Sequence, residues 1–179
     1  MTGTAADPMT VVAAPVLTAE RLTRRFRRGT ETVTALDEVS LQLYGGELTV
    51  AAGPSGSGKT TLLSVLAGIE RPDSGQVHTH PPLPTGLPHH QLRFSELGFI
   101  PQALATLDEL TVTENVALPV MLAAGTTRLP DGEVEATEQL LTELEIAHLA
   151  SRYPDQISGG ERQRVAVARA LRSRPTVLL

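Results

Sequence analysis

Residues 53–60, which read Gly-Pro-Ser-Gly-Ser-Gly-Lys-Thr, constrain the fold of this chain more than any other segment. Their glycines let the backbone turn so tightly that consecutive N–H groups point at one spot. An apolar segment, residues 48–52, precedes this loop, and residues 60–69 follow it with the periodicity of a helix. The pattern predicts a β-strand, an anion-binding loop and a helix whose positive N-terminal end faces the bound anion.

The spacing of the loop, G-x-x-x-x-G-K-T, is typical of proteins that bind the phosphates of a nucleoside triphosphate. Lys59 is the only lysine among the 15 cationic side chains, so this position favours a compact ammonium over a planar guanidinium. We expect Lys59 to contact the β- and γ-phosphates, and the hydroxyl of Thr60 to bind Mg²⁺. The residues expected at the phosphates are Gly53, Pro54, Ser55, Gly56, Ser57, Gly58, Lys59, Thr60 and Thr61.

The composition indicates one soluble domain. Apolar residues make up 41% of the 179 residues, but no apolar run approaches the roughly 18 residues that cross a bilayer. The net charge of −5 argues against a general nucleic-acid binder. The absence of cysteine excludes disulfides and zinc–thiolate sites, and it is compatible with the cytoplasm. We expect residues 1–15 to form a disordered leader and residues 16–179 to form the domain.

Apolar periodicity predicts a mixed α/β fold. Residues 17–52 read as short strands broken by glycine turns, with alternation at Val39, Leu41 and Leu43. Four prolines between residues 81 and 88 exclude regular structure there. We expect further strands at 77–80, 97–100 and 175–179, and helices at 60–69, 113–124, 131–144 and 158–172.

Two of the expected helices each have a distinctive side-chain pattern, one apolar and one acidic. The helix after the phosphate loop is expected to bury Leu62, Leu63, Val65, Leu66 and Ile69. The helix at 131–144 is acidic and has no basic residue, which favours a solvated face over a metal site. Its acidic residues are Asp131, Glu133, Glu135, Glu138 and Glu143.

A second candidate anion site opens the last expected helix. Ser158 is a suitable N-cap, and Glu161 completes a capping box with it. An ordinary cap is therefore one interpretation. However, capping does not require Gly159 or Gly160, and each glycine costs a helix about 1 kcal/mol relative to alanine. Close approach of a phosphate to this first turn would account for both glycines.

Residues 157–165, Ile-Ser-Gly-Gly-Glu-Arg-Gln-Arg-Val, resemble the LSGGQ signature of ATP-binding-cassette (ABC) transport ATPases. Residues 97–102 and 110–119 are especially similar to the lipoprotein-release and macrolide-export members of that family. The resemblance extends over residues 17–179. It implies an α/β P-loop NTPase (RecA-like) core, an N-terminal antiparallel β-subdomain and an α-helical subdomain at 103–160, with the fold incomplete at its C-terminus.

The resemblance also implies roles for single residues. Phe26 matches the aromatic residue that stacks on adenine, although a core position in a strand is the alternative. Gln102 matches the glutamine that reaches Mg²⁺ and the attacking water. ATP would lie between two copies of the chain in a head-to-tail homodimer. The residues expected at the γ-phosphate of ATP held by the other copy are Ser158, Gly159 and Gly160, and Glu161 is expected to belong to the same ATP-binding site.

The implied partner is a membrane permease, so the chain would lie peripherally on the inner face of the plasma membrane and, by its subfamily resemblance, power export. Glu161 departs from the usual glutamine, which we expect to be tolerated. The Asp and Glu that bind Mg²⁺ and polarise water in the family should follow residues 175–179, and neither they nor the switch histidine occurs in residues 1–179. We therefore expect weak ATP binding, negligible hydrolysis and poor solubility.

Three other functions share part of this pattern. A P-loop nucleotide kinase carries nearly the same phosphate loop, but it has no counterpart of residues 158–164. An ABC protein of DNA repair or translation usually carries insertions, zinc sites or paired cassettes, and none is evident in the sequence. A binding module without catalysis is the third alternative. Association with a multi-span permease would distinguish the transport ATPase from all three.

Overall fold

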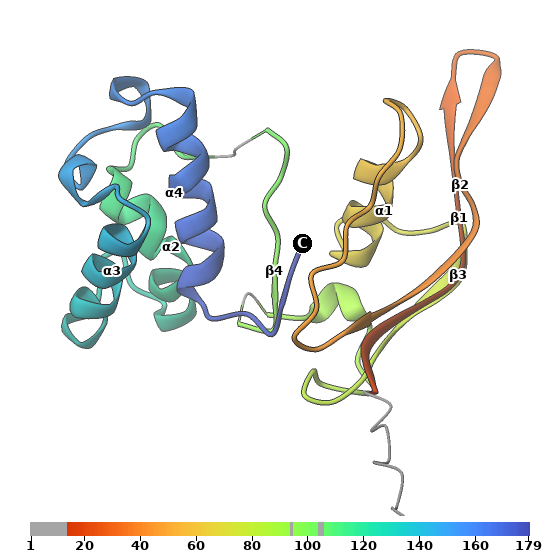
Figure 1. The fold of residues 1–179 in the computed structure, drawn as a ribbon, viewed down its shortest axis with the longest axis horizontal. Coiled ribbons are helices and arrows are strands. Elements are labelled where there is room, and N and C mark those ends of the chain that lie inside the picture. The colour runs from red at the N-terminus through yellow and green to blue at the C-terminus, as the bar shows by residue number, and fades with distance from the viewer. Residues whose placement is uncertain (1–13, 94, 104–105) are drawn as a thin grey trace, which may run out of the picture.

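The computed structural model describes residues 14–93, 95–103 and 106–179, which form a sheet unit and a helical unit placed side by side (Figure 1). Residues 1–13 of the expected leader lie outside the described residues. The strands are β1 (Pro15–Arg28), β2 (Glu31–Tyr44), β3 (Ser74–Thr79), β4 (Leu97–Gly98) and β5 (Val177–Leu178). The helices are α1 (Lys59–Leu66), α2 (Val112–Ala124), α3 (Asp131–Glu143) and α4 (Gly159–Arg172), with short 3₁₀ turns at His89–Gln91, Ala147–Leu149 and Pro154–Gln156.

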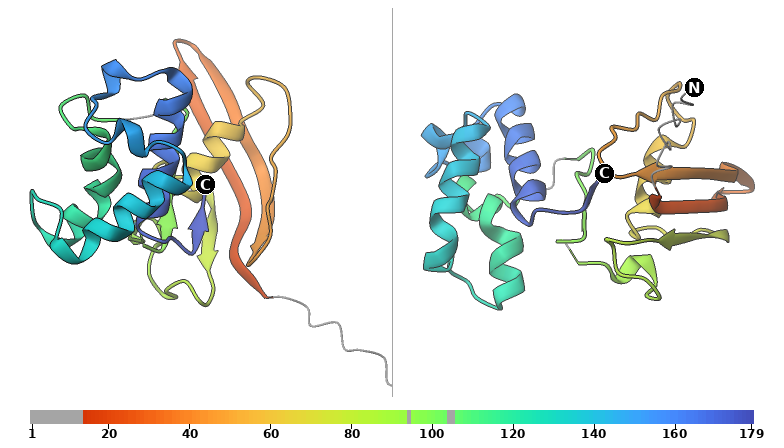
Figure 2. Two further views of the ribbon diagram at one scale, coloured as in Figure 1. Left: turned by 60° about the vertical axis from the view of Figure 1, so that its left-hand side comes forward. Right: turned by 60° about the horizontal axis from the view of Figure 1, so that its bottom comes forward.

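The sheet unit is an antiparallel sheet of order β2-β1-β3, with α1 packed on one of its faces (Figure 2). Its core is formed by side chains from both layers: Leu17, Ala19, Leu22, Leu36, Val65 and Leu66. The helix after the phosphate loop is confirmed, and so is the burial of its last two apolar residues. Ile69, which was expected to be buried, is 63% exposed because α1 ends three residues earlier, at Leu66.

The region read as several short strands contains two long ones, β1 and β2, each of 14 residues. The register of this hairpin shifts between Ala19 and Leu22 and again between Leu22 and Arg24. Arg21 lies at the first shift and Glu38 at the second, and both have φ near +50°. These two residues form an exposed ion pair of 2.7 Å across the hairpin. Such irregularities break the apolar alternation without ending the strands, which explains why the sequence pattern suggested shorter elements.

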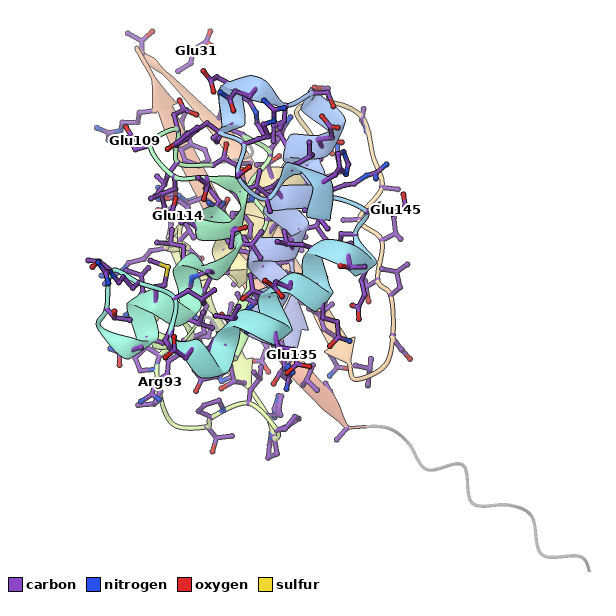
Figure 3. The ribbon with its side chains drawn as sticks, turned by 90° about the vertical axis from the view of Figure 1, so that its left-hand side faces the viewer. Glu31, Arg93, Glu109, Glu114, Glu135 and Glu145 are labelled. Atoms are coloured by element: carbon purple, nitrogen blue, oxygen red, sulfur yellow. The ribbon has the colours of Figure 1, made fainter. Side chains whose placement is uncertain are left out.

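The helical unit packs α2, α3 and α4 around a second core. Capping boxes start two of its helices, Thr111 with Glu114 at α2 and Ser158 with Glu161 at α4, so these expected helices are confirmed. Figure 3 views this unit from its outer side, with Glu114 and Glu145 on opposite sides of α4. The core residues are Val112, Val116, Leu141, Ile146, Leu149, Val165 and Ala168.

The acidic face of α3 is not wholly solvated. Arg172, at the end of α4, is only 6% exposed and donates from Nε to the hydroxyl of Thr137 at 2.8 Å. Its Nη2 also bonds the backbone oxygen of Glu133, at 3.0 Å, and the Glu133 carboxylate. Because this partner comes from a helix 39 positions away in sequence, the pattern of α3 alone could not predict the ion pair.

The strands β4 and β5 lie between the two units and pair in parallel, with Leu97 opposite Val177. The N–H of Ile100 continues the ladder to the backbone oxygen of Leu179 at 2.8 Å. This confirms both short strands predicted at 97–100 and 175–179. Among the described residues, no helix is both long enough and apolar enough to pass through a bilayer.

The apolar segment before the phosphate loop, residues 48–52, is not a strand in this structure. Leu48 is 92% exposed and Val50 is 75% exposed. A strand forms only where a neighbouring strand accepts its backbone hydrogen bonds, and no strand of the described residues pairs with this segment. The prediction of a strand here was therefore wrong for this structure, and two large apolar side chains are left in solvent.

Exposed apolar side chains promote self-association, so replacing Leu48 and Val50 together by serine should raise the soluble concentration of the chain. We expect the melting temperature to change by less than about 2 °C, because exposed positions contribute little to stability. Light scattering and thermal melts would measure both quantities. Leu22→Ser, at a fully buried position, is the control and should lower the melting temperature strongly. Unchanged aggregation of the double variant would contradict the prediction.

Candidate nucleotide-binding site

A cavity of about 1040 Å³ lies in the sheet unit, where α1 and the phosphate loop meet the β1–β2 hairpin and residues 178–179. It brings together residues that are far apart in the sequence, from the first strand to the segment after β4. The predicted site residues that line it are Phe26, Ser55, Gly56, Gly58, Lys59, Thr60, Thr61 and Gln102. The expected base-stacking and Mg²⁺-binding residues and most of the expected phosphate-binding residues therefore face one space, whereas Gly53, Pro54 and Ser57 do not line it.

The phosphate loop ends at Gly58, which is the N-cap of α1 and has a φ of 88°. A Cβ atom at this position would lie 2.1 Å from the backbone oxygen of Ala35 on β2. Both the left-handed backbone and this close approach require glycine. No side chain caps the helix, and its first turn holds no acidic residue. The N–H groups at the start of α1 are thus available to an anion.

Lys59 is folded into its own loop. Its Nζ donates to the backbone oxygens of Gly53, at 2.9 Å, and Pro54, at 2.7 Å, and contacts Ser57 Oγ at 3.3 Å. These are neutral acceptors, and no ion pair to Lys59 is found in the described part of the chain. Phosphate oxygens entering the loop would offer this ammonium charged acceptors in place of neutral ones.

Phe26 is 38% exposed and borders the cavity, so it is not simply a buried core residue of β1. Gln102 is also exposed and borders the cavity. The oxygens of Thr60 and Gln102 are ligands of the kind that Mg²⁺ prefers, and both residues line the same space. The residues present therefore fit a nucleotide with its magnesium ion.

The second expected anion site is built differently. Ser158 Oγ accepts from the N–H of Glu161 at 3.3 Å, while the Glu161 carboxylate accepts from the Ser158 hydroxyl and N–H, both at 2.7 Å. These bonds hold the pKa of the Glu161 carboxyl below its usual range. Gly159 and Gly160 are exposed, and a Cβ atom on either would meet no heavy atom within 4 Å. The packing of this chain therefore does not require glycine at either position.

The two candidate anion sites are not brought together. None of Ser158, Gly159, Gly160 or Glu161 lines the described cavity, which lies in the sheet unit, whereas α4 belongs to the helical unit. The phosphate loop and the first turn of α4 do lie toward the same edge of the molecule (Figure 1). The signature residues are thus exposed and lie outside the cavity that the phosphate loop lines.

Sequence reasoning missed Arg24, whose guanidinium carbon lies 4.7 Å from the centroid of the Phe26 ring. The two residues are separated by one position on β1, so their side chains share a face of the strand. That spacing was the only signal available, because the acidic partners of Arg24 lie 46 and 49 positions further along the chain.

Comparisons with known proteins agree with this fold. The chain is 38% identical over 167 residues to the lipoprotein-releasing system ATP-binding protein LolD of Idiomarina loihiensis. This match covers 92% of the chain and 72% of the LolD protein. It is 40% identical over 146 residues to the sulfate/thiosulfate import ATP-binding protein CysA of Pseudomonas aeruginosa, covering 81% of this chain. The chain spans only 44% of the length of that CysA protein.

Among solved structures, the dimeric ATP-binding cassette MJ0796 in a post-hydrolysis state, bound to ADP and Pi, is similar with a TM-score of 0.73 and 29% identity. The match covers 90% of this chain and 72% of that one. The expected α/β cassette fold is therefore confirmed. The sequence model of the family described as "ABC transporter" matches residues 36–179. Because this match covers most of the sequence, the chain belongs to the ABC transporter family and carries its ATP-binding domain.

Proposed function

We propose that this chain binds ATP with Mg²⁺ and serves as the ATP-binding subunit that powers transport through a separate membrane permease. The observation that carries the proposal is the single cavity shared by Phe26, the phosphate loop and Gln102. Phe26 would stack on the adenine, the loop would hold the phosphates, and Lys59 would neutralise the β- and γ-phosphates. The ion would be held by Thr60 and Gln102, and it would offset the charge that develops on the phosphates.

The second half of the ATP site would come from another copy of the chain. A head-to-tail homodimer would place Ser158, Gly159 and Gly160 of one copy on the γ-phosphate held by the other. Three findings support this: the signature residues do not line the cavity of their own chain, the glycines lack a packing role, and a similar cassette is dimeric. ATP supplies the negative charge that both half-sites attract, so its presence favours closure and its hydrolysis favours opening.

Hydrolysis by the 179-residue chain itself should be negligible. None of the described residues that line the cavity is Asp or Glu, so the cavity offers no carboxylate to polarise water. Gln102 could orient a water molecule but could not accept its proton. Efficient hydrolysis would need this group from a position outside the described cavity lining.

The permease would dock beside the segment that carries Gln102. A second cavity, of about 300 Å³, lies between β4, α2 and α4, and its lining is mostly apolar. It is lined by Gly98, Phe99, Leu107, Leu118, Pro119, Leu122, Arg169, Ala170 and Ser173. Leu107 and Leu122 are exposed, as expected of a surface that a partner covers. The chain would thus be peripheral on the inner face of the plasma membrane, and export remains our preferred direction from the resemblance of residues 110–119.

Replacing Lys59 by alanine should weaken MgATP binding by about 10- to 100-fold, because a bond from a charged donor to phosphate is lost. Lys59→Arg should restore little affinity if the loop accepts only a compact ammonium, as the three short contacts of Nζ suggest. Calorimetry would measure both variants. A clear ATPase rate of the unmodified chain, lost in Lys59→Ala, would contradict the proposed lack of hydrolysis.

Replacing Gly159 and Gly160 together by alanine tests whether these glycines serve the helix or contact ATP held by another copy. The double variant should melt about 3–6 °C higher, because each alanine favours the helix and has space for its Cβ. It should nevertheless lose MgATP-dependent dimerisation, measured by size-exclusion chromatography with light scattering. Gly132→Ala is the matched control, since Gly132 also lies in the first turn of a helix with open space around it. Dimerisation unaffected by the double variant would exclude the proposed contact.

Replacing Leu122 by aspartate should release the chain from its permease without affecting MgATP binding, because a charge would enter the apolar cavity of the docking surface. Co-purification with a multi-span permease from cells that carry both proteins is the measurement. Leu87→Asp is the control, since Leu87 is similarly exposed (52% against 60%) but lies away from this cavity. Equal recovery of the permease with both variants would place the docking surface elsewhere.

A further inference from the structure

Arg24 covers one face of the candidate base-stacking residue. Its guanidinium carbon lies 4.7 Å from the centroid of the Phe26 ring, which is within the range of a cation–π contact. The Nε atom of Arg24 is buried and has no hydrogen-bond partner. The cation–π contact therefore involves a guanidinium that is partly withdrawn from water.

Two carboxylates that follow α1 hold Arg24 in this position. Its Nη1 donates to Asp73 Oδ1 at 2.8 Å, and its Nη2 bonds the Glu70 carboxylate. Asp73 also accepts from the N–H of Arg25 at 2.7 Å. The helix α1 begins at the phosphate loop, and these two carboxylates follow its last residue. Arg24 therefore connects the Phe26 ring, on which a base would stack, to the segment that follows the phosphate-binding helix.

Part of the Phe26 side chain remains exposed at the cavity. Phe26 lines the large cavity and is 38% exposed, whereas Arg24 does not line that cavity. Arg24 thus contacts the ring without lining the space that contains Lys59 and Thr60. A planar base that entered this space with its phosphates in the loop would meet the ring on the face that Arg24 leaves uncovered.

We propose that Arg24 is a positioning residue for the purine base: it fixes the Phe26 ring from behind and leaves the cavity side of the ring for stacking. The inference rests on the proposed function, since it needs ATP in this cavity. An ordered ring loses little freedom when a base stacks on it, and a cation behind the ring reduces the repulsion between the two π-systems. Arg24 should thus contribute to recognition of the base and not to recognition of the phosphates.

The test compares two ligands, MgATP and magnesium tripolyphosphate, which share the phosphates but differ in the nucleoside. In calorimetric titrations of the full chain, Arg24→Ala should weaken MgATP binding by about 3- to 10-fold, the size of a cation–π contact and part of a stacking contact. Its affinity for tripolyphosphate should stay within about twofold of the unmodified chain, because the loop is untouched. Arg24→Lys should recover part of the MgATP affinity.

Arg27→Ala is the matched control, since Arg27 is an exposed arginine on the same strand, next to Phe26. It should leave both affinities unchanged. In a Phe26→Leu background, Arg24→Ala should cause no further loss of MgATP affinity, because the ring through which it acts is gone. Thermal melts would verify folding, and Arg24→Gln, which can still bond Asp73 but carries no charge, replaces Arg24→Ala if that variant does not fold.

Three results would overturn the inference: equal weakening of both ligands, no weakening of MgATP, or a full additional loss in the Phe26→Leu background. Other results would contradict the proposed function and not only the role of Arg24. If the unmodified chain binds neither ligand, ATP binding itself is excluded, and the role of Arg24 falls with it. If it binds tripolyphosphate as tightly as MgATP, the phosphate site stands, but the base is not recognised and only the role of Arg24 is lost.

Discussion

The close approach of Gly58 to the backbone of β2 is the constraint on which the candidate site depends. Because a Cβ atom at residue 58 would lie 2.1 Å from the oxygen of Ala35, the start of α1 is held directly against the sheet. The helix is short, with eight residues, and among the described residues no side chain caps its positive end and no acidic residue lies in its first turn. The sheet thereby presents the N–H groups of the loop to the cavity.

The starts of α1 and α4 show how similar sequence patterns can lead to different electrostatic states. In α4, the reciprocal bonds of Ser158 and Glu161 satisfy the N–H groups of these two residues. The carboxylate oxygen that caps Ser158 could be replaced by the amide oxygen of a glutamine, which accounts for an acidic residue at this place in the signature. Capping does not explain why glycine occupies residues 159 and 160, where a Cβ atom would have space. The proposed dimer assigns these two glycines to the contact with ATP held by the other copy.

The sequence was sufficient to predict the helices whose starts carry capping residues or glycines. Ser158 starts α4 with the capping box expected from the sequence, and the glycine-rich loop stands before α1 as expected. Elements that depend on a distant partner were not predictable in the same way. Residues 48–52 have the composition of a strand but no pairing neighbour, and the contacts of Arg24 and Arg172 join segments more than 30 positions apart.

The position of Gln102 follows from a very small sheet. It lies a few residues beyond β4, which is held by pairing to β5 and by the bond from Ile100 to Leu179. Gly98 permits this pairing, because a Cβ there would lie 2.9 Å from Pro175 and 3.0 Å from Leu178. Leu178 and Leu179 also border the cavity, so the same strand both supports Gln102 and forms part of the wall that Gln102 faces. Because β5 is the next element after α4, a displacement of the helical unit would move β5. The hydrogen bonds between β4 and β5 would pass this movement on to the wall of the nucleotide cavity.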